Sequence, residues 1–117
     1  MRALLLLIPL AACGTPAPSA EGRWFGPMTP DAGQPGCAAS RASLIVNRGA
    51  ALFTPDEGTW TLTGTATPDG AISAERSGSA ANKQPFPTRM QARWEGDHIN
   101  GTYKTPRCSF TFGLRQP

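Results

Sequence analysis

The feature that most limits what this chain can fold into is a strict alternation of apolar and polar side chains near its C-terminus. The alternation runs through residues 89–95, 98–104 and 108–115, with short turn-like segments between them. A period of two is typical of a β-strand with one face in a core and the other in water. The apolar positions are Met90, Ala92, Trp94, Ile99, Gly101, Tyr103, Cys108, Phe110, Phe112 and Leu114. The pattern predicts three consecutive antiparallel strands.

A similar pattern continues toward the N-terminus. Residues 59–66 alternate in the same way, and shorter apolar runs lie at 44–46, 51–53 and 71–72, separated by turn signals such as Asn47-Arg48-Gly49. The 12 Pro and 13 Gly leave little room for a long helix. We therefore predict an all-β domain of seven or eight strands joined by hairpins. Such a sheet exposes two edges unless its first and last strands meet, which favours a small antiparallel up-and-down β-barrel; a β-sandwich is the alternative.

Two stretches are predicted to be loops because they lack strand periodicity. Residues 27–36 contain three Pro and two Gly, a composition that argues against a helix or a central strand. Residues 77–88 form the longest later stretch without alternation, and they place Phe86 between Pro85 and Pro87. Two roles for Phe86 remain open. It either caps the open end of the barrel or contacts a partner from a stiffened backbone.

The first residues have the organisation of a bacterial export signal. Arg2 supplies a positive charge, and residues 3–10 form an apolar run that is too short to span a bilayer. The segment Leu10-Ala11-Ala12-Cys13 resembles the lipobox of bacterial lipoproteins. The resemblance implies that residues 1–12 are a signal peptide and that acylated Cys13 binds the lipid bilayer. An ordinary secretory signal with an incidental Cys13 is the alternative. Gly14, where an Asp would retain a lipoprotein at the inner membrane, favours the outer membrane, facing the periplasm.

Behind this anchor the chain is organised as a tether and one domain. Residues 13–21 comprise Cys13 and a Pro-rich segment of the kind that stays extended, and residues 22–117 are predicted to form a single small β-domain. Only Cys37 and Cys108 remain once Cys13 carries lipid, and an exported location favours their oxidation. We predict a disulfide between them. Free thiols or a share of a metal site are the alternatives, although a single His and no CxxC spacing argue against zinc.

The charge of the chain bears on one class of partner. Its formal net charge is +3, and removal of Arg2 with the signal leaves 10 basic against 8 acidic residues. A nucleic-acid interface needs a clustered basic stripe, whereas the Lys and Arg residues are scattered along this sequence. No nucleic-acid partner is expected.

Two short motifs resemble a known family of barrels. Gly22-Arg23-Trp24 at the start of the first predicted strand, together with Arg115 at the end of the last, resembles the signature of lipocalins and the wider calycin group. The resemblance implies that Trp24 closes one end of a barrel and that Arg115 packs across its ring. It also implies a carrier of a small apolar ligand.

Catalysis is not expected from this sequence. Nucleophilic catalysis needs a base beside the nucleophile, and the single His98 falls on the polar face of a predicted strand, where a solvated side chain is the simpler interpretation. The paired carboxylates Asp56 and Glu57 lie in a predicted turn, where Asp serves backbone geometry. The chain has no phosphate-binding loop and no cluster of metal ligands, so neither a cofactor nor a metal is expected.

Two kinds of binding remain. The barrel can enclose a small apolar ligand between aromatic side chains, although small barrels are usually filled by their own side chains. The aromatic candidates are Trp60, Trp94, Tyr103, Phe110 and Phe112. Alternatively the outer wall or the loops contact another envelope protein, as small lipoproteins that inhibit lytic enzymes do. Protein contact is the function favoured at this stage.

Overall fold

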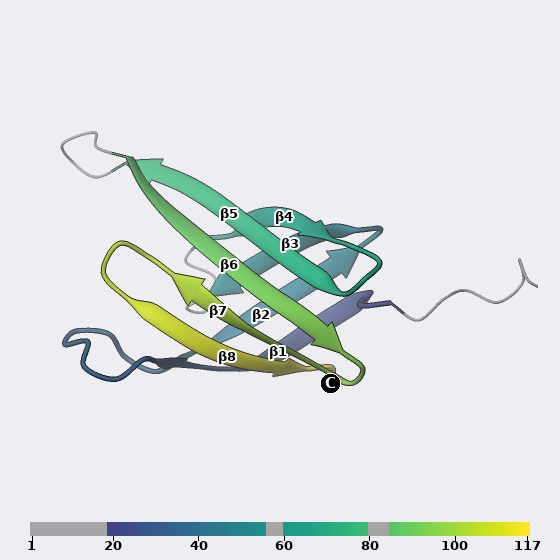
Figure 1. The fold of residues 1–117 in the computed structure, drawn as a ribbon, viewed down its shortest axis with the longest axis horizontal. Helices are drawn as coiled ribbons and strands as arrows, with labels where there is room; N and C mark the ends of the chain where they lie inside the picture. The colour runs from purple at the N-terminus through teal and green to yellow at the C-terminus, as the bar shows by residue number, and fades with distance from the viewer. Residues whose placement is uncertain (1–18, 56–59, 80–84) are drawn as a thin grey trace, which may run out of the picture.

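The computed structural model describes residues 19–55, 60–79 and 85–117, which form eight β-strands (Figure 1). The hairpin of β5 and β6, the latter the longest strand, lies across the front of the molecule in this view, with β2 and β3 behind it. No helix long and apolar enough to cross a membrane occurs in the described ranges. The strands are β1 (Gly22–Pro30), β2 (Ser40–Asn47), β3 (Ala50–Pro55), β4 (Leu62–Ala66), β5 (Ala71–Ser79), β6 (Pro85–Glu95), β7 (His98–Lys104) and β8 (Ser109–Arg115).

The strands close into a barrel in simple sequential order. Each strand pairs antiparallel with the next, and β1 pairs with β8 through Phe25 opposite Arg115 and Met28 opposite Phe112. The predicted all-β, up-and-down barrel is confirmed with eight strands, and the sandwich alternative is wrong. Closure removes the two edges that an open sheet of this order would expose.

The interior is filled by the alternating apolar residues. Phe53 lies at its centre, with its ring centroid 5.6 Å from that of Tyr103 and 5.1 Å from that of Phe112. Burial of each such side chain stabilises the fold by about 1.5–3 kcal/mol relative to an exposed one. The core residues are Ala20, Trp24, Met28, Ala42, Leu44, Val46, Ala51, Phe53, Leu62, Ile72, Ala74, Met90, Ile99, Tyr103, Phe110, Phe112 and Leu114.

Glycine allows the strands to approach closely where the wall bends. A Cβ added at Gly64 would lie 1.8 Å from the carbonyl oxygen of Ser73. A Cβ added at Gly101 would lie 2.7 Å from Cζ of Phe112, so the ring occupies the space that a side chain would need. These two positions on the inner face therefore require Gly, as expected at tight bends of a small barrel.

The two ends of the barrel differ. At one end the strands are joined by the short turns 48–49, 67–70 and 96–97, and both the start of β1 and the end of β8 lie there (Figure 1). We call this the turn end. At the other end lie the connections 31–39 and 105–108, and we call it the loop end.

The turn end is closed by the residues that precede β1. The indole Nε1 of Trp24 donates a hydrogen bond to the carbonyl oxygen of Ala20 at 2.8 Å, and Ala20 is buried. The carboxylate of Glu21 accepts hydrogen bonds from the backbone N–H groups of Arg48 at 2.9 Å and Gly49 at 3.4 Å. Two residues of the predicted tether are thus in contact with the barrel.

The prediction of a loop over residues 27–36 is wrong in its first part. β1 continues to Pro30, and Met28 is fully buried and paired with Ser40. The inward alternation of Trp24, Gly26 and Met28 decides the conformation, because the burial of Met28 outweighs the ladder hydrogen bonds that Pro27 and Pro30 cannot donate. The connection itself spans residues 31–39.

The prediction of a loop over residues 77–88 is also wrong at both ends. β5 extends to Ser79 and β6 starts at Pro85, with Gly78 paired opposite Phe86. Where a two-stranded hairpin projects beyond the core, its strands do not need an apolar residue at every second position. The sequence therefore carries no strand signal there. The side chain of Phe86 lies outside the described residues, and its role as cap or contact stays a prediction.

Candidate ligand-binding pocket

The predicted disulfide is present and organises the loop end of the barrel. Cys37, in the 31–39 connection, is bonded to Cys108, with a Cα–Cα distance of 6.0 Å and a separation of 71 positions in sequence. The bond ties the segment before β2 to the start of β8. It therefore fastens together connections that lie at opposite ends of the domain sequence.

Gln34 makes a second attachment at the same place. Its amide nitrogen donates to the carbonyl oxygen of Ser109 at 2.9 Å, and its amide oxygen accepts from the N–H of Ser109 at 2.7 Å. Together with the N–H of Asp31, which donates to the same carbonyl oxygen at 2.9 Å, the Gln34 side chain ties the 31–39 connection to the first residue of β8. Sequence reasoning missed this role, since nothing local distinguishes such a Gln from a solvated one.

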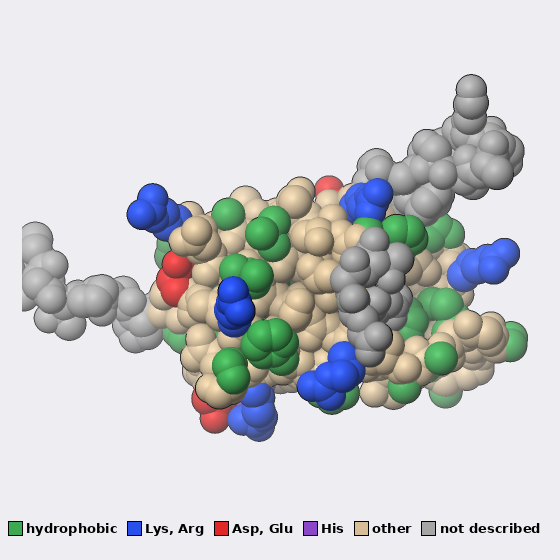
Figure 2. Space-filling model, turned by 180° about the vertical axis from the view of Figure 1, so that it is seen from behind, with side chains coloured by type: hydrophobic (Ala, Val, Ile, Leu, Met, Phe, Trp, Pro, Cys, Tyr) green, Lys and Arg blue, Asp and Glu red, His purple; other side chains and the backbone are tan. Residues whose placement is uncertain are grey.

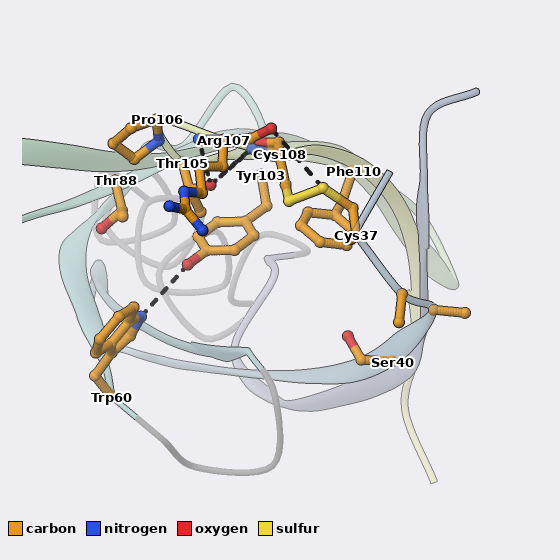
Figure 3. A pocket seen from close by; sticks show the side chains of 13 residues that line it. Cys37, Ser40, Trp60, Thr88, Tyr103, Thr105, Pro106, Arg107, Cys108 and Phe110 are labelled. Carbon is orange, nitrogen blue, oxygen red and sulfur yellow. Dashed lines mark hydrogen bonds between the residues drawn. A yellow bond between two sulfur atoms is a disulfide. The ribbon is translucent and has the colours of Figure 1, made fainter. Parts of the chain in front are cut away.

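A pocket of about 600 Å³ lies at the loop end, beside the disulfide (Figure 3). Residues from β2, β6, β7 and β8 and from the connections 31–39 and 105–108 line it, together with Trp60 from the segment before β4. Its lining is mainly apolar. The lining residues are Gly36, Cys37, Ala38, Ala39, Ser40, Trp60, Thr88, Tyr103, Thr105, Pro106, Arg107, Cys108 and Phe110.

Tyr103 joins the pocket to the core of the barrel. Its ring stacks on Phe110 with centroids 5.8 Å apart and contacts Phe53 from the other side. Its hydroxyl oxygen accepts a hydrogen bond from Nε1 of Trp60 at 3.4 Å, which Figure 3 shows across the pocket. The guanidinium of Arg76 lies 5.1 Å from the centre of the Trp60 ring, a cation–π contact on the side of β5.

Two hydroxyl groups lie among these apolar side chains. Thr88 is buried, and its Oγ1 donates to the carbonyl oxygen of Arg76 at 3.1 Å. Ser40 Oγ is buried and has no hydrogen-bond partner in the described structure. The Ser40 hydroxyl is therefore an unsatisfied polar group on the pocket wall. A buried hydroxyl without a partner costs about 1–3 kcal/mol.

The connection 105–108 forms a tight turn held by Thr105. The N–H of Thr105 donates to the carbonyl oxygen of Cys108 at 2.8 Å, and Oγ1 of Thr105 accepts from the N–H groups of Arg107 at 3.2 Å and Cys108 at 2.9 Å. The backbone of Arg107 is therefore fixed between Thr105 and a disulfide-bonded residue. Its side chain is exposed at the rim of the pocket.

The pocket contains three of the five aromatic residues predicted as ligand contacts. Trp60, Tyr103 and Phe110 line it. Phe112 is buried in the core, and Trp94 lies at the turn end, where its Nε1 donates to the carbonyl oxygen of Gly96 at 2.7 Å. Alternation predicts that an aromatic side chain faces the interior of the barrel. It does not predict whether that side chain lies in the packed core or in the pocket at the loop end.

The packing of Arg115 across Trp24, implied by the calycin resemblance, is not what the structure shows. Trp24 faces the interior and is buried, as that resemblance implies. Arg115 is paired opposite Phe25 and so shares the outer face with it; its side chain is 69% exposed and its Nη1 lies 3.4 Å from Oδ2 of Asp97. The register of β1 against β8 separates the two side chains by one residue, which places them on opposite faces.

His98 belongs to a polar cluster on the outer wall at the turn end. Its Nδ1 lies 2.9 Å from Oδ1 of Asp97, and its Nε2 lies 3.6 Å from Oε1 of Glu95. The hydrogen bond from His98, and next the positive charge of Arg115, lower the pKa of Asp97 below the usual 3.8. These groups lie across the turn between β6 and β7. No group of three or more His, Cys, Asp or Glu residues that could hold a metal occurs in the part of the chain that is described.

A comparable shift occurs in the neighbouring turn. A hydrogen bond from the hydroxyl of Thr67, and next one from the N–H of Ala71, lower the pKa of Asp69 below 3.8. Arg93 also donates to the carbonyl oxygen of Asp69 at 3.1 Å. This carboxylate serves the geometry of the 67–70 turn, in keeping with the role of Asp in turns.

Comparison with known proteins adds no relative to this picture. No protein-family model matches the chain, and no curated protein or solved structure matches it either.

Proposed function

We propose that the domain binds a small, mainly apolar ligand in the pocket at the loop end. The observation that carries the proposal is a cavity of about 600 Å³ walled by Trp60, Tyr103, Phe110 and the Cys37–Cys108 bond. Small-molecule sites are concave, have volumes of about 300–1,000 Å³, and are lined by apolar and aromatic side chains with a few polar groups. This pocket has each of these properties.

The depth of the pocket is set by the packing beneath it. Phe53, Met90 and Leu62 are fully buried in the middle of the barrel, so the interior is filled there as expected for eight strands. The pocket is thus a cup above a solid core. A ligand can occupy it without displacing any residue that stabilises the fold.

Substitution of Ser40 tests the proposal without touching the core. Ser40→Phe places a ring in the pocket and removes the unpartnered hydroxyl, so the domain should stay folded while an apolar fluorescent probe such as N-phenylnaphthylamine no longer binds. Ser40→Ala removes the same hydroxyl but leaves the pocket open, and this variant should bind the probe as the wild type does. Equal binding by all three proteins, or by none, contradicts the proposal.

We also propose that the domain is held at a bacterial membrane by an acylated Cys13. Support comes from Leu10-Ala11-Ala12-Cys13, and residues 1–18 lie outside the described structure. The Cys37–Cys108 bond fits an oxidising compartment outside the cytoplasm, and the outer membrane facing the periplasm is the proposed location. Cys13→Ser should block incorporation of labelled palmitate and leave the precursor uncleaved. A variant that is still acylated or processed normally contradicts the anchor.

Contact with another envelope protein is the second candidate, supported by one feature of the outer wall. Phe25, Ile45 and Leu52 are each about 40% exposed and lie on the adjacent strands β1, β2 and β3, with Ile45 directly opposite Leu52. Figure 2 shows the side of the barrel opposite to Figure 1, where apolar side chains occur in small groups separated by polar surface and by Lys and Arg. Such groups are smaller than the continuous apolar patches typical of protein interfaces, so the pocket has the stronger support.

Photo-crosslinking distinguishes the second candidate. A photoreactive residue in place of Leu52 should form one discrete protein adduct in intact cells, whereas the same residue in place of Glu75, on the outer face of β5, should not. Adducts at both positions, or at neither, contradict a specific contact through this part of the wall.

A further inference from the structure

The charged groups that the structure describes at the pocket are positive. Among the lining residues that the structure describes, Arg107 carries the single formal charge, and none is a carboxylate. Arg76 adds a second positive charge behind Trp60, with its guanidinium 5.1 Å from the ring centre. The described lining of the pocket is therefore apolar, with positive charge at its rim.

Neither of these cations has an ion-pair partner among the described residues. Within the described part of the chain, the ion pairs are Arg89 with Glu75, Arg115 with Asp97, and His98 with Glu95 and Asp97. Arg107 and Arg76 take part in none of them. A guanidinium presents a planar fork of N–H donors that matches the two oxygens of a carboxylate or phosphate.

We propose that the ligand is an anionic amphiphile, whose apolar chain or ring fills the cup and whose anionic head group pairs with Arg107 at the rim. This inference rests on the proposed function, since it names the chemistry of the ligand that the pocket takes. The turn formed by Thr105 already fixes the backbone of Arg107 at the mouth of the pocket in the free protein. Binding therefore costs less backbone conformational entropy than it would if this turn were flexible. The apolar floor formed by Tyr103 and Phe110 excludes a second charge on the buried part of the ligand.

The test compares three probes with the same apolar chain and different head groups. Decanoate and decyltrimethylammonium below their micelle concentrations, and decanol below its solubility limit, are titrated by calorimetry into the purified full chain with its disulfide formed. At low salt, decanoate should bind about tenfold more tightly than decanol, as one charge-assisted contact worth ~1.4 kcal/mol predicts. Decyltrimethylammonium should bind most weakly. Added salt should lower the affinity for decanoate and leave that for decanol unchanged.

Two variants assign the head-group contact. Arg107→Gln should lower the affinity for decanoate to that for decanol and leave decanol binding unchanged. Arg48→Gln removes an exposed positive charge at the turn end and should change neither affinity. If Arg76→Gln, rather than Arg107→Gln, abolishes the preference for decanoate, the assignment to Arg107 is wrong.

Failure of this inference and failure of the proposed function give different results. Equal binding of decanoate and decanol by the wild type overturns the anionic head group, while a loss of both in Ser40→Phe still supports the pocket. If none of the three probes binds, or if Ser40→Phe binds them as well as the wild type does, both proposals are overturned.

Discussion

At the scale of single residues, Arg48 holds a conformation that its side chain opposes. It has a φ of 53° and is followed by Gly49 with a φ of 82°, the pattern of a two-residue turn in which both residues are left-handed. A residue with a Cβ is disfavoured in this region by about 1–2 kcal/mol, whereas Asn visits it more readily. The strain is maintained because the β2–β3 pairing on both sides fixes the turn.

Relief of this strain is testable. Arg48→Asn should raise the free energy of unfolding by about 0.5–1 kcal/mol, because Asn-Gly is a preferred pair for such a turn and the backbone N–H that donates to Glu21 is kept. Urea unfolding followed by fluorescence measures the change. Arg48→Ala, which removes the same charge without the local advantage of Asn, is the control, and a gain equal to that of Asn would refute the argument.

The carboxyl of Asp97 gives a second prediction at this scale. Because its pKa is lowered in the folded protein, it adds stability above the ordinary value of 3.8, and this contribution is lost as the pH falls through the folded pKa. His98→Ala removes the largest cause of the shift, so the pKa of Asp97 should rise toward 3.8, and Arg115→Gln should have a smaller effect. Carboxyl chemical shifts followed against pH by NMR report both. An unchanged pKa in His98→Ala excludes the hydrogen bond as the cause.

At the scale of strands, the glycines of the inner face decide how tightly the barrel closes. Gly64 is paired with Ala51 on one side and Ala74 on the other, so the wall at β3, β4 and β5 is lined by small residues. Gly64→Ala would place Cβ 1.8 Å from a carbonyl oxygen, and the backbone of β5 must move to admit it. The expected loss of stability is about 2–3 kcal/mol.

Gly113→Ala is the matched control for that change. Its Cβ would lie 3.3 Å from the side-chain oxygen of Asn100, a flexible group that can shift, and the residue is on a strand like Gly64. Chemical denaturation should show a loss of less than about 1 kcal/mol for this variant. Similar losses for the two variants would mean that the general cost of Ala in a strand, and not the close approach at Gly64, explains the first result.

The strands also show which part of the architecture can be predicted from sequence. β7 and β8 follow directly from alternation because each has one buried and one exposed face, and the disulfide follows from the count of Cys. The extension of β1 through Pro27 was missed because local rules weigh the lost N–H of Pro and cannot weigh the burial of Met28 across the barrel. The aromatic residues of the pocket can be predicted, because alternation places them on the inner face. Its rim cannot, because it is formed by connections such as 105–108 whose conformation depends on tertiary contacts.

At the scale of the whole molecule, the Cys37–Cys108 bond should contribute much of the stability. A loop closed over 71 residues restricts the unfolded chain by about 4 kcal/mol in the chain-entropy model, against a total of about 5–15 kcal/mol for a typical domain. The double substitution Cys37→Ala with Cys108→Ala should lower the unfolding free energy by that amount in a urea titration. Reduction of the wild type should give a similar loss, and a loss below about 1 kcal/mol would show that the barrel closes without help from the bond.

The difference between the two ends of the barrel bears on how a ligand would reach the pocket if the molecule is attached through Cys13, as proposed above. β1 starts at the turn end, where Ala20 and Glu21 also lie against the barrel. The pocket lies at the loop end, and so at the opposite end of the barrel from the side on which the proposed anchor attaches. Under the proposed anchor and ligand, an amphiphile would therefore enter at the end of the barrel farthest from the membrane attachment.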